Sequence, residues 1–396
     1  CTHEPAVALA ERLIRLAPAG LTRCFYADNG SSAIEVAVKM SFHYWRNRGH
    51  VRKRRFITLA NSYHGETLGA LAVGHVELYR EIYQPLLMEG VITAPSPDAW
   101  AAAPGETPED CARRAAAAMA ELLERHGAET CAVIVEPVVQ CAAGMRMHSP
   151  LYLTLLRELC DRHDVHLIAD EIAVGFGRTG TLFACEHAAV TPDFLCLSKG
   201  ITGGYLPLSV VLTRDEVYEA FYDEYAQLRA FLHSHSYSGN ALACAAALAT
   251  LDIFESDAVL ERNRALAARL GERARALLGD LPHVAQVRQA GMIVAAELAR
   301  HGDRRDPFDW RERRGVQVYR HALGHEALLR PIGNVVYFMP PYVITPEQID
   351  TLVATARDSI LEATADCPAR PSRRVPAMQP PSAAATPAAS STGLEF

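Results

Sequence analysis

The sequence has little that would place it at a membrane or on a nucleic acid. Among its 396 residues, no apolar run approaches the roughly 18 residues of a membrane-spanning helix, and its first residues have neither the basic nor the apolar region of a secretory signal. Lys and Arg together number 39 against 46 Asp and Glu, a formal charge of −7, which disfavours nucleic acids and anionic membranes as partners. We therefore expect a cytoplasmic protein that binds small soluble ligands.

Cys-x-x-Cys pairs are also absent, although the sequence contains ten cysteines. Several cysteines lie inside apolar runs, such as those at 131–137 and 194–200. An unpaired cysteine behaves as a small hydrophobic residue and is usually buried. The pattern predicts reduced core thiols, as in a cytosolic protein, and no metal site.

What the chain does contain is a series of short apolar runs that alternate with helical patterns. Hydrophobic residues make up 49% of the sequence and charged residues 21%, which is the composition of a globular protein. Helical periodicity occurs at 32–47, 107–126 and 151–163. Strands that are apolar on both faces and separated by helices are typical of a mainly parallel sheet covered on both sides, so we predict an α/β fold. The seven predicted strands are 23–27, 54–60, 90–95, 131–137, 165–172, 193–198 and 208–213.

The second half of the chain has a different pattern. A helical Ala-rich stretch at 239–255 precedes a charged amphipathic helix at 257–280, strand-like runs at 291–298 and 335–344, and a helix at 346–362. The last residues are rich in Pro, Ala and Ser, which is typical of disorder. The predicted division is a remnant of an N-terminal segment at 1–20, a large domain at 21–255, a smaller α+β domain at 256–365 and a disordered tail at 366–396.

Two charged residues stand at the ends of predicted strands, where an open parallel sheet binds its ligands. Asp170 ends one apolar run and Lys199 follows another. Taken alone, Asp170 is better explained as a helix N-cap or as a carboxylate bound by backbone N–H groups, and Lys199 has the alternative of a surface lysine. Together they suit pyridoxal phosphate, whose aldehyde takes the amine of a lysine and whose ring nitrogen takes a carboxylate.

The phosphate of such a cofactor would need a cradle of hydrogen-bond donors. Gly30, Ser31 and Ser32 begin a predicted helix, whose first N–H groups are free to bind an anion. The same residues allow a second interpretation, because Ser32 with Glu35 matches a capping box. Tyr63, in a loop after a predicted strand, either stacks on the cofactor ring or is an ordinary half-buried tyrosine.

Two long blocks, at 167–184 and 192–204, resemble the class III (ω-) aminotransferases of fold type I. The resemblance covers about residues 5–362. It implies a pyridoxal-phosphate enzyme in which Lys199 forms the Schiff base and shuttles a proton, while Asp170 holds the pyridine nitrogen. It further implies that Gly30 and Ser31 hold the phosphate and that Tyr63 and Ile172 cover the two faces of the ring.

The resemblance also implies a homodimer with shared active sites. His235 and Ser236 match the pair that reaches the phosphate from the neighbouring subunit, and the resemblance implies that Ser234 lies beside the substrate. Arg330 matches the residue that binds the substrate carboxylate, although a surface salt-bridge arginine is the alternative. Arg178 is expected to be architectural.

Further blocks point to the branch of the family that serves biotin synthesis. That branch transfers the amino group of S-adenosylmethionine to 8-amino-7-oxononanoate, which gives 7,8-diaminononanoate. The alternatives are a class III transaminase with another amine donor and a non-catalytic cofactor-binding relative. Four differences from other family members bear on this choice. The sequence starts after a family segment that covers the substrate, and Ser236 stands where Thr is usual. Glu66 replaces an Asp found in some members, and Ala173 replaces a Gln that many other members carry. The blocks are 61–67, 136–147, 233–240 and 329–342.

Overall fold

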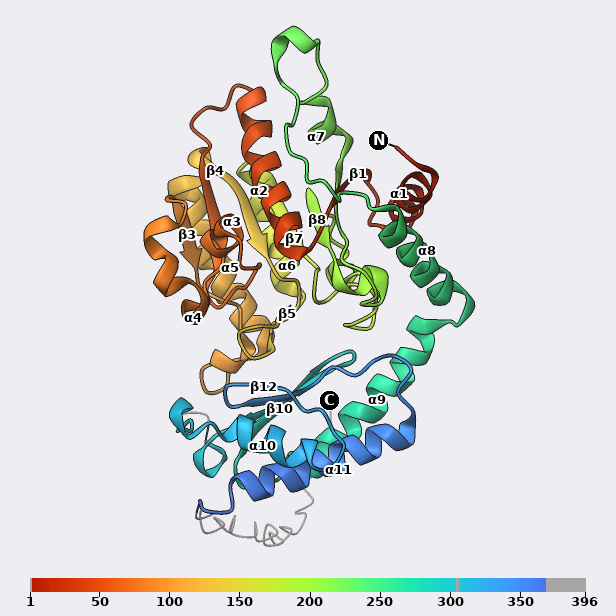
Figure 1. The fold of residues 1–396 in the computed structure, drawn as a ribbon. Helices are drawn as coiled ribbons and strands as arrows, with labels where there is room; N and C mark the ends of the chain where they lie inside the picture. The colour runs from red at the N-terminus through yellow and green to blue at the C-terminus, as the bar shows by residue number, and fades with distance from the viewer. Residues whose placement is uncertain (1, 304–305, 368–396) are drawn as a thin grey trace, which may run out of the picture.

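A seven-stranded sheet forms the centre of the larger part of the molecule (Figure 1). The computed structural model describes residues 2–303 and 306–367. Six strands run parallel, and β9 runs antiparallel to both of its neighbours, which confirms the mainly parallel sheet. In sheet order the strands are β1 (Leu21–Ala27), β9 (Ser209–Arg214), β8 (Phe194–Leu197), β7 (His166–Asp170), β4 (Thr130–Val135), β2 (Arg55–Leu59) and β3 (Val91–Ala94).

Helices cover both faces of this sheet, as the apolar runs predicted. The helix α2 (Gly30–Asn47) packs on one face, and α5 (Pro108–His126) with α6 (Leu151–Arg162) covers the other. Because successive side chains of a strand point to opposite faces, Phe56 joins the α2 core while Ile57 joins the α5 and α6 core. Smaller helices are α3 (Leu68–Val73), α4 (Glu77–Arg80) and α7 (Asp215–Glu219).

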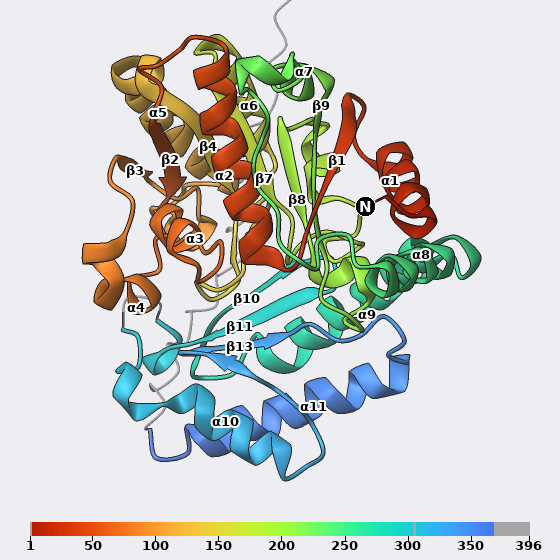
Figure 2. The ribbon, with the colours of Figure 1, turned by 45° about the horizontal axis from the view of Figure 1, so that its top comes forward.

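A smaller antiparallel sheet lies below the large one (Figures 1 and 2). It belongs to the C-terminal part of the chain, for which an α+β structure was predicted. Three helices pack on one face of this sheet. The run at 335–344 is a strand only as far as Phe338, since the prolines at 340 and 341 lack the N–H groups of a sheet. The elements are β10 (Val284–Ala290), β11 (Ile293–Leu298), β13 (Val335–Phe338), β12 (Pro331–Ile332), α9 (Val259–Leu278), α10 (Arg314–Leu323) and α11 (Pro346–Ala363).

A short hairpin, β5 (Val139–Gln140) and β6 (Arg146–Met147), contacts both parts of the molecule. Arg146 donates two hydrogen bonds to the carboxylate of Glu297 on β11, at 3.0 and 3.1 Å. Glu297 also pairs with Arg288 at 2.8 Å, and Arg288 donates to the carbonyl of Met145. This buried charge network fixes the hairpin to the small sheet.

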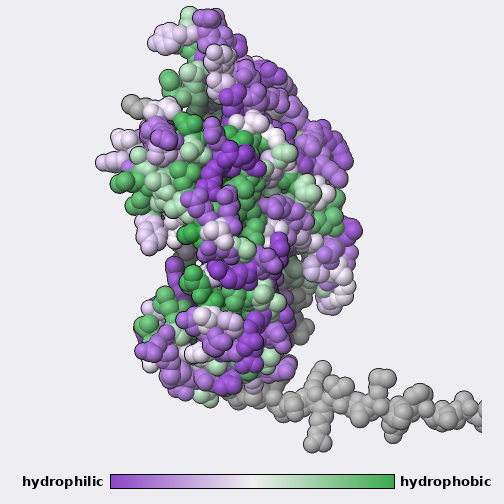
Figure 3. All heavy atoms as spheres, turned by 90° about the vertical axis from the view of Figure 1, so that its right-hand side faces the viewer, coloured by the Kyte–Doolittle hydropathy of each residue, from purple (hydrophilic) through white to green (hydrophobic). Residues whose placement is uncertain are grey.

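The N-terminal residues form α1 (Glu4–Leu16), which packs on α8 (Ala241–Ser256). Arg12 of α1 pairs with Glu255 at 2.9 Å. Figure 3 views the molecule from the side of these helices, where hydrophobic side chains lie among hydrophilic ones. In the predicted tail, Asp366 pairs with Arg314 at 2.6 Å, and the prediction from 368 onward lies outside the described residues.

The cysteines of the described chain carry no disulfide. Nine are free, and seven of these are buried in the core, as the apolar runs around them predicted. Between residues 2 and 367, leaving out 304 and 305, no helix is both long and apolar enough to cross a membrane.

Candidate active site

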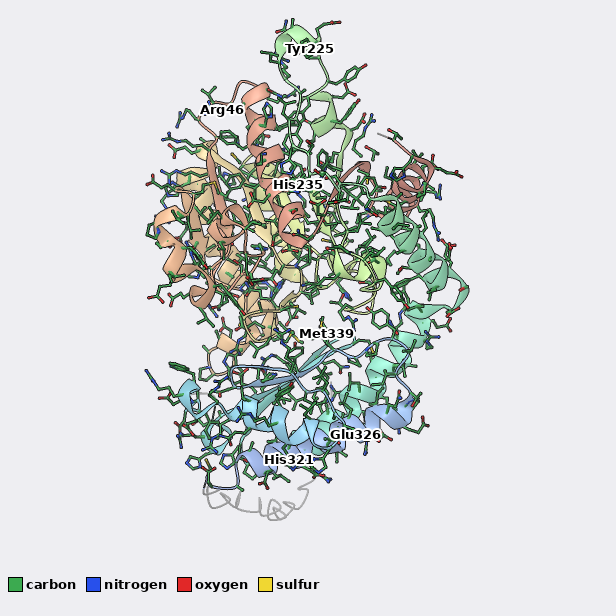
Figure 4. The ribbon with its side chains drawn as sticks, viewed as in Figure 1. Arg46, Tyr225, His235, His321, Glu326 and Met339 are labelled. Atoms are coloured by element: carbon green, nitrogen blue, oxygen red, sulfur yellow. The ribbon has the colours of Figure 1, made fainter. Side chains whose placement is uncertain are left out.

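A cavity of about 560 Å³ lies where the carboxyl ends of the large sheet face the small sheet. Residues that follow β1, β2, β4, β7 and β8 line it from one side. The small sheet closes the other side, and Figure 4 shows Met339 between the two parts of the molecule. The lining residues that matter below are Gly30, Ser31, Tyr63, His64, Glu66, Glu136, Cys141, Asp170, Ile172, Lys199, Arg330 and Tyr337.

Asp170 is the last residue of β7, and its carboxylate is almost fully buried. One oxygen lies 2.7 Å from Nδ1 of His64, and the other accepts the N–H of Ile172 at 3.1 Å. Within the described residues, Nε2 of His64 is buried without a hydrogen-bond partner. The arrangement holds an acceptor carboxylate at the cavity, where it can pair with a cationic ring nitrogen.

Lys199 is the amine that lines the cavity. The chain has only three lysines. Lys39 contacts His233 at 2.9 Å, and the buried Lys53 donates to the carbonyl of Thr130 at 3.1 Å. Lys199 begins the 3-10 helix η5 (Lys199–Thr202) with a φ of 46°, a left-handed conformation that is strained for a lysine and is common at functional sites.

The first turn of α2 forms one rim of the cavity. Asn29 caps the helix, since its side chain accepts the N–H of Ser32 at 3.1 Å. The capping box of Ser32 and Glu35 is therefore wrong, and the Glu35 carboxylate instead accepts the hydroxyl of Thr67 at 2.6 Å. The single backbone N–H of Gly30, the first residue of this helix, has no intrahelical partner, so it can bind an anion.

Two glycines keep this rim open. Gly65 has a φ of +123°, and a Cβ there would lie 2.1 Å from Oγ of Ser31. A Cβ at Gly30 would lie 3.0 Å from Ile172. Larger residues would therefore displace Ser31 and Ile172, two side chains that line the cavity.

Tyr63 lies in the loop after β2 with its ring half-buried at the cavity. Its hydroxyl donates to Glu66 at 2.8 Å, and its ring centre lies 5.3 Å from that of Tyr79. Burial, and then the bond to Glu66, raise the pKa of Tyr63 well above its usual value. Its hydroxyl therefore stays protonated at neutral pH and acts as a donor.

Glu136 was not predicted as a site residue, although its motif was recognised. It follows β4 directly, as Asp170 ends β7, so a carboxylate at the end of a buried strand was the available signal. Its oxygens accept the N–H groups of Tyr63 at 2.9 Å and Cys141 at 3.0 Å. Burial raises the pKa of Glu136 to about 7.

Arg330 and Arg178 lie in contrasting environments. Arg330 lines the cavity, is exposed to solvent and forms no ion pair with any residue of the described chain. Arg178 is half-buried and does not line the cavity; it donates to the carbonyl of Pro340 at 2.7 Å and lies 4.4 Å from the ring centre of Tyr342. These contacts of Arg178 are structural.

Three predicted residues do not line the cavity of this chain. Ser234, His235 and Ser236 are exposed, and Nδ1 of His235 lies 2.7 Å from Oδ2 of Asp28. In Figure 4, His235 lies beside α2 and well away from Met339. The expectation that they act in a neighbouring subunit stays a prediction.

The arrangement fits pyridoxal phosphate. One cavity holds an amine at Lys199, a buried carboxylate at Asp170 and a rim of free N–H groups that two glycines keep open. These are the partners that its aldehyde, ring nitrogen and phosphate require. Among the described residues, no group of three or more His, Cys, Asp or Glu could hold a metal ion.

This sequence and fold are similar to those of known proteins. Residues 1–360 match the family model described as aminotransferase class-III. The adenosylmethionine-8-amino-7-oxononanoate aminotransferase of Geobacter sulfurreducens is 47% identical, over 91% of this chain and 79% of that protein. The crystal structure of the same-named protein from Methanocaldococcus jannaschii is 36% identical with a TM-score of 0.85, over 91% of this chain and 80% of that one. The omega transaminase from Pseudomonas jessenii in complex with PMP is 28% identical with a TM-score of 0.87, over 92% and 80% of the two chains.

Proposed function

The chain belongs to the class-III aminotransferases, and from that membership we propose that it transfers the amino group of S-adenosylmethionine to 8-amino-7-oxononanoate. The product is 7,8-diaminononanoate, and the reaction belongs to biotin biosynthesis. The names of the Geobacter and Methanocaldococcus relatives support this choice of substrates. The observation that carries the proposal is the meeting of Lys199, Asp170 and the α2 rim in one cavity.

Pyridoxal phosphate is the proposed cofactor. Lys199 would bind its aldehyde, Asp170 its ring nitrogen, and Gly30 with Ser31 its phosphate. Tyr63 and Ile172 would lie on the two faces of its ring. When bound, the cofactor supplies an electron sink for the carbon that loses its proton.

Three side chains of the cavity have separate roles in proton transfer, cofactor binding and substrate binding. Nζ of Lys199 would carry the proton from the substrate carbon. The carboxylate of Asp170, held by His64, keeps a cationic ring nitrogen in place. The guanidinium of Arg330, which has no carboxylate partner within the described residues, binds the carboxylate of the keto acid through two parallel hydrogen bonds.

We further propose a homodimer in which the partner's His235 and the partner's Ser236 complete the phosphate site and the partner's Ser234 lies beside the substrate. Large apolar side chains are exposed around this segment, which supports a contact surface there. Tyr225, one of them, lies at the tip of a projecting loop in Figure 4. The exposed residues are Tyr205, Tyr225, Leu228, Leu232 and Tyr237.

We propose two domains, one built around each sheet, with the boundaries predicted from the sequence. Residues 21–255 form the cofactor domain, and 256–365 the small domain that closes the cavity with Arg330, Tyr337 and Met339. The core changes from that of the large sheet to that of the small sheet between α8 and α9. A cytoplasmic location is proposed from the buried free thiols.

The experiment follows each half of the reaction in turn. The protein, loaded with pyridoxal phosphate, is mixed with S-adenosylmethionine alone, and the cofactor is extracted and separated by chromatography. The proposal expects the aminated cofactor, and then 7,8-diaminononanoate when the keto acid is added. Turnover with other amines, but none with S-adenosylmethionine, would favour a different class III donor. A bound cofactor that is never aminated would favour a non-catalytic relative.

A further inference from the structure

Glu136 is a buried carboxylate at the cavity to which the proposed reaction gives no chemical step. Its side chain lines the cavity but is only 5% exposed. It follows β4, which lies between β2 and β7 in the sheet. The loop after β2 carries His64, and β7 ends at Asp170. Glu136 therefore follows the strand that lies between the two strands whose ends carry these residues.

The two oxygens of Glu136 bind two different loops. Oε1 accepts the N–H of Tyr63, in the loop after β2, at 2.9 Å. Oε2 accepts the N–H of Cys141, in the hairpin after β4, at 3.0 Å. The first loop also brings Glu66 to the cavity, and the second brings Met145. A single carboxylate therefore joins two walls of the cavity.

Two charged or titratable side chains act directly on Glu136, one from the loop after β2 and one from the end of β7. His64, from the β2 loop, favours the ionised carboxylate, whereas Asp170, from β7, disfavours it. Both backbone N–H groups favour the ionised form, and burial opposes all three favourable contacts. Lys199 lies close enough to act on the neighbouring Cys141 thiol. The balance places the pKa of Glu136 at about 7.

We propose that Glu136 is a positioning residue, which holds the Tyr63 loop and the Cys141 loop together so that the cofactor is bound between them. The inference rests on the proposed function, because it assigns the residue a task toward the cofactor. A neutral glutamine in its place has one acceptor oxygen and one amide group. It can accept one of the two N–H groups but must turn a donor toward the other.

The chain contains a matched carboxylate that lacks this task. Glu171 is fully buried, accepts the N–H groups of Ala184 at 2.6 Å and Cys185 at 2.7 Å, and has a pKa that burial raises to about 7. It does not line the cavity. Glu136 and Glu171 thus share burial, two backbone contacts and a raised pKa, and differ in where their contacts lead.

The test compares Glu136→Gln with Glu171→Gln in the full chain. The dissociation constant of pyridoxal phosphate, the pH profile of the visible absorbance of bound cofactor, and the Tm are measured for each. We expect Glu136→Gln to weaken cofactor binding roughly tenfold or more. One of the two buried backbone N–H groups would then face the amide donor of the glutamine, so its hydrogen bond to a charged carboxylate would be lost. We also expect a step near pH 7 in the absorbance profile to disappear. Glu171→Gln should lower the Tm and leave both cofactor measurements as in the wild type.

Equal effects of the two variants on cofactor binding and on the pH profile would overturn the inference. If Glu136→Gln does not fold, Glu136→Asp is measured in the same way, because it keeps the charge but withdraws the carboxylate by one methylene. Weakened cofactor binding supports the inference, and unchanged binding overturns it. Failure of the proposed function is distinguishable, since the wild type itself would then bind no cofactor or leave it unaminated.

Discussion

Nδ1 of His64 lies 2.7 Å from Oδ2 of Asp170, and this contact joins two strands that are not neighbours in the sheet. Asp170 ends β7, whereas His64 lies beyond the end of β2, with β4 between them. The carboxyl end of β7 and the loop after β2 therefore meet across β4. Asp170 is thereby held in position before any ligand arrives, which reduces the entropy lost on binding.

The charge of Asp170 should be essential for cofactor affinity. Asp170→Asn keeps the shape of the side chain but removes the charge that a cationic ring nitrogen needs, so we expect pyridoxal phosphate to bind about ten- to a hundredfold more weakly. Equilibrium titration of the apoprotein measures this. Asp193→Asn is the control, because Asp193 is equally buried but pairs with Arg157 at 2.8 Å. It should lower the Tm and spare cofactor affinity, and the opposite pattern would refute the assignment.

Gly65→Ala should damage the phosphate rim. The new Cβ would lie 2.1 Å from Oγ of Ser31, so Ser31 must move, and we expect roughly a tenfold or greater loss of affinity for pyridoxal phosphate. Gly49→Ala is the matched control, since Gly49 also has a positive φ, of +85°, but has nothing within 4 Å of its ideal Cβ. It should cost about 1 kcal/mol of stability and leave affinity unchanged. Equal affinity losses in both variants would argue against a rim at Ser31.

Arg330 should act on one substrate only. Arg330→Lys retains a charge but loses the planar pair of donors, so we expect the KM for the keto acid to rise about tenfold or more. Amination of the cofactor by S-adenosylmethionine should be little changed. Single-turnover measurements of each half-reaction test this, and an equal loss in both halves would contradict the role of Arg330 in binding the keto acid.

His166 should make the protein sensitive to acid. Burial lowers the pKa of His166 from 6.5 to about 4, and its ring is stacked on Trp45, with Nδ1 2.9 Å from Ser41. Between pH 6.5 and about 4, His166 therefore binds a proton in the unfolded state but not in the folded state. The stability that this contributes is fully present above pH 6.5 and is lost as the pH falls through 4, by up to about 3 kcal/mol.

Urea unfolding between pH 4 and 7.5 measures this loss. His166→Gln, which cannot titrate, should show a flatter dependence of the free energy of unfolding on pH in this window. A variant with the same slope as the wild type would show that another group causes the acid sensitivity.

The main features of the fold were predictable because strands buried on both faces leave short, uninterrupted apolar runs. All seven strands of the large sheet were found in this way. β10 was missed because only Val284 and Arg288 of its seven residues are buried, and its sequence does not alternate clearly. α10 was missed because three of its ten residues are Arg or His and interrupt its apolar pattern.

The candidate site was only partly predictable. Lys199 and Asp170 end strands of one parallel sheet, so their meeting at one edge follows from topology. The partners of Asp170 and Glu136 do not follow from it, since those contacts join loops distant in sequence. His64 and Asp170 are 106 residues apart, and Tyr63 and Glu136 are 73 apart. Side-chain geometry was needed to find them.

The central claim is that Lys199 is the residue that binds the cofactor covalently. The most direct measurement is reduction of the pyridoxal-phosphate-loaded protein with borohydride, followed by peptide mapping by mass spectrometry. Only three lysines compete for the label, and Lys39 and Lys53 are held by other contacts. The account predicts the mass of the reduced cofactor on the peptide that contains Lys199, and none in Lys199→Ala. A label on Lys39 or Lys53, or an unlabelled wild-type protein, would contradict it.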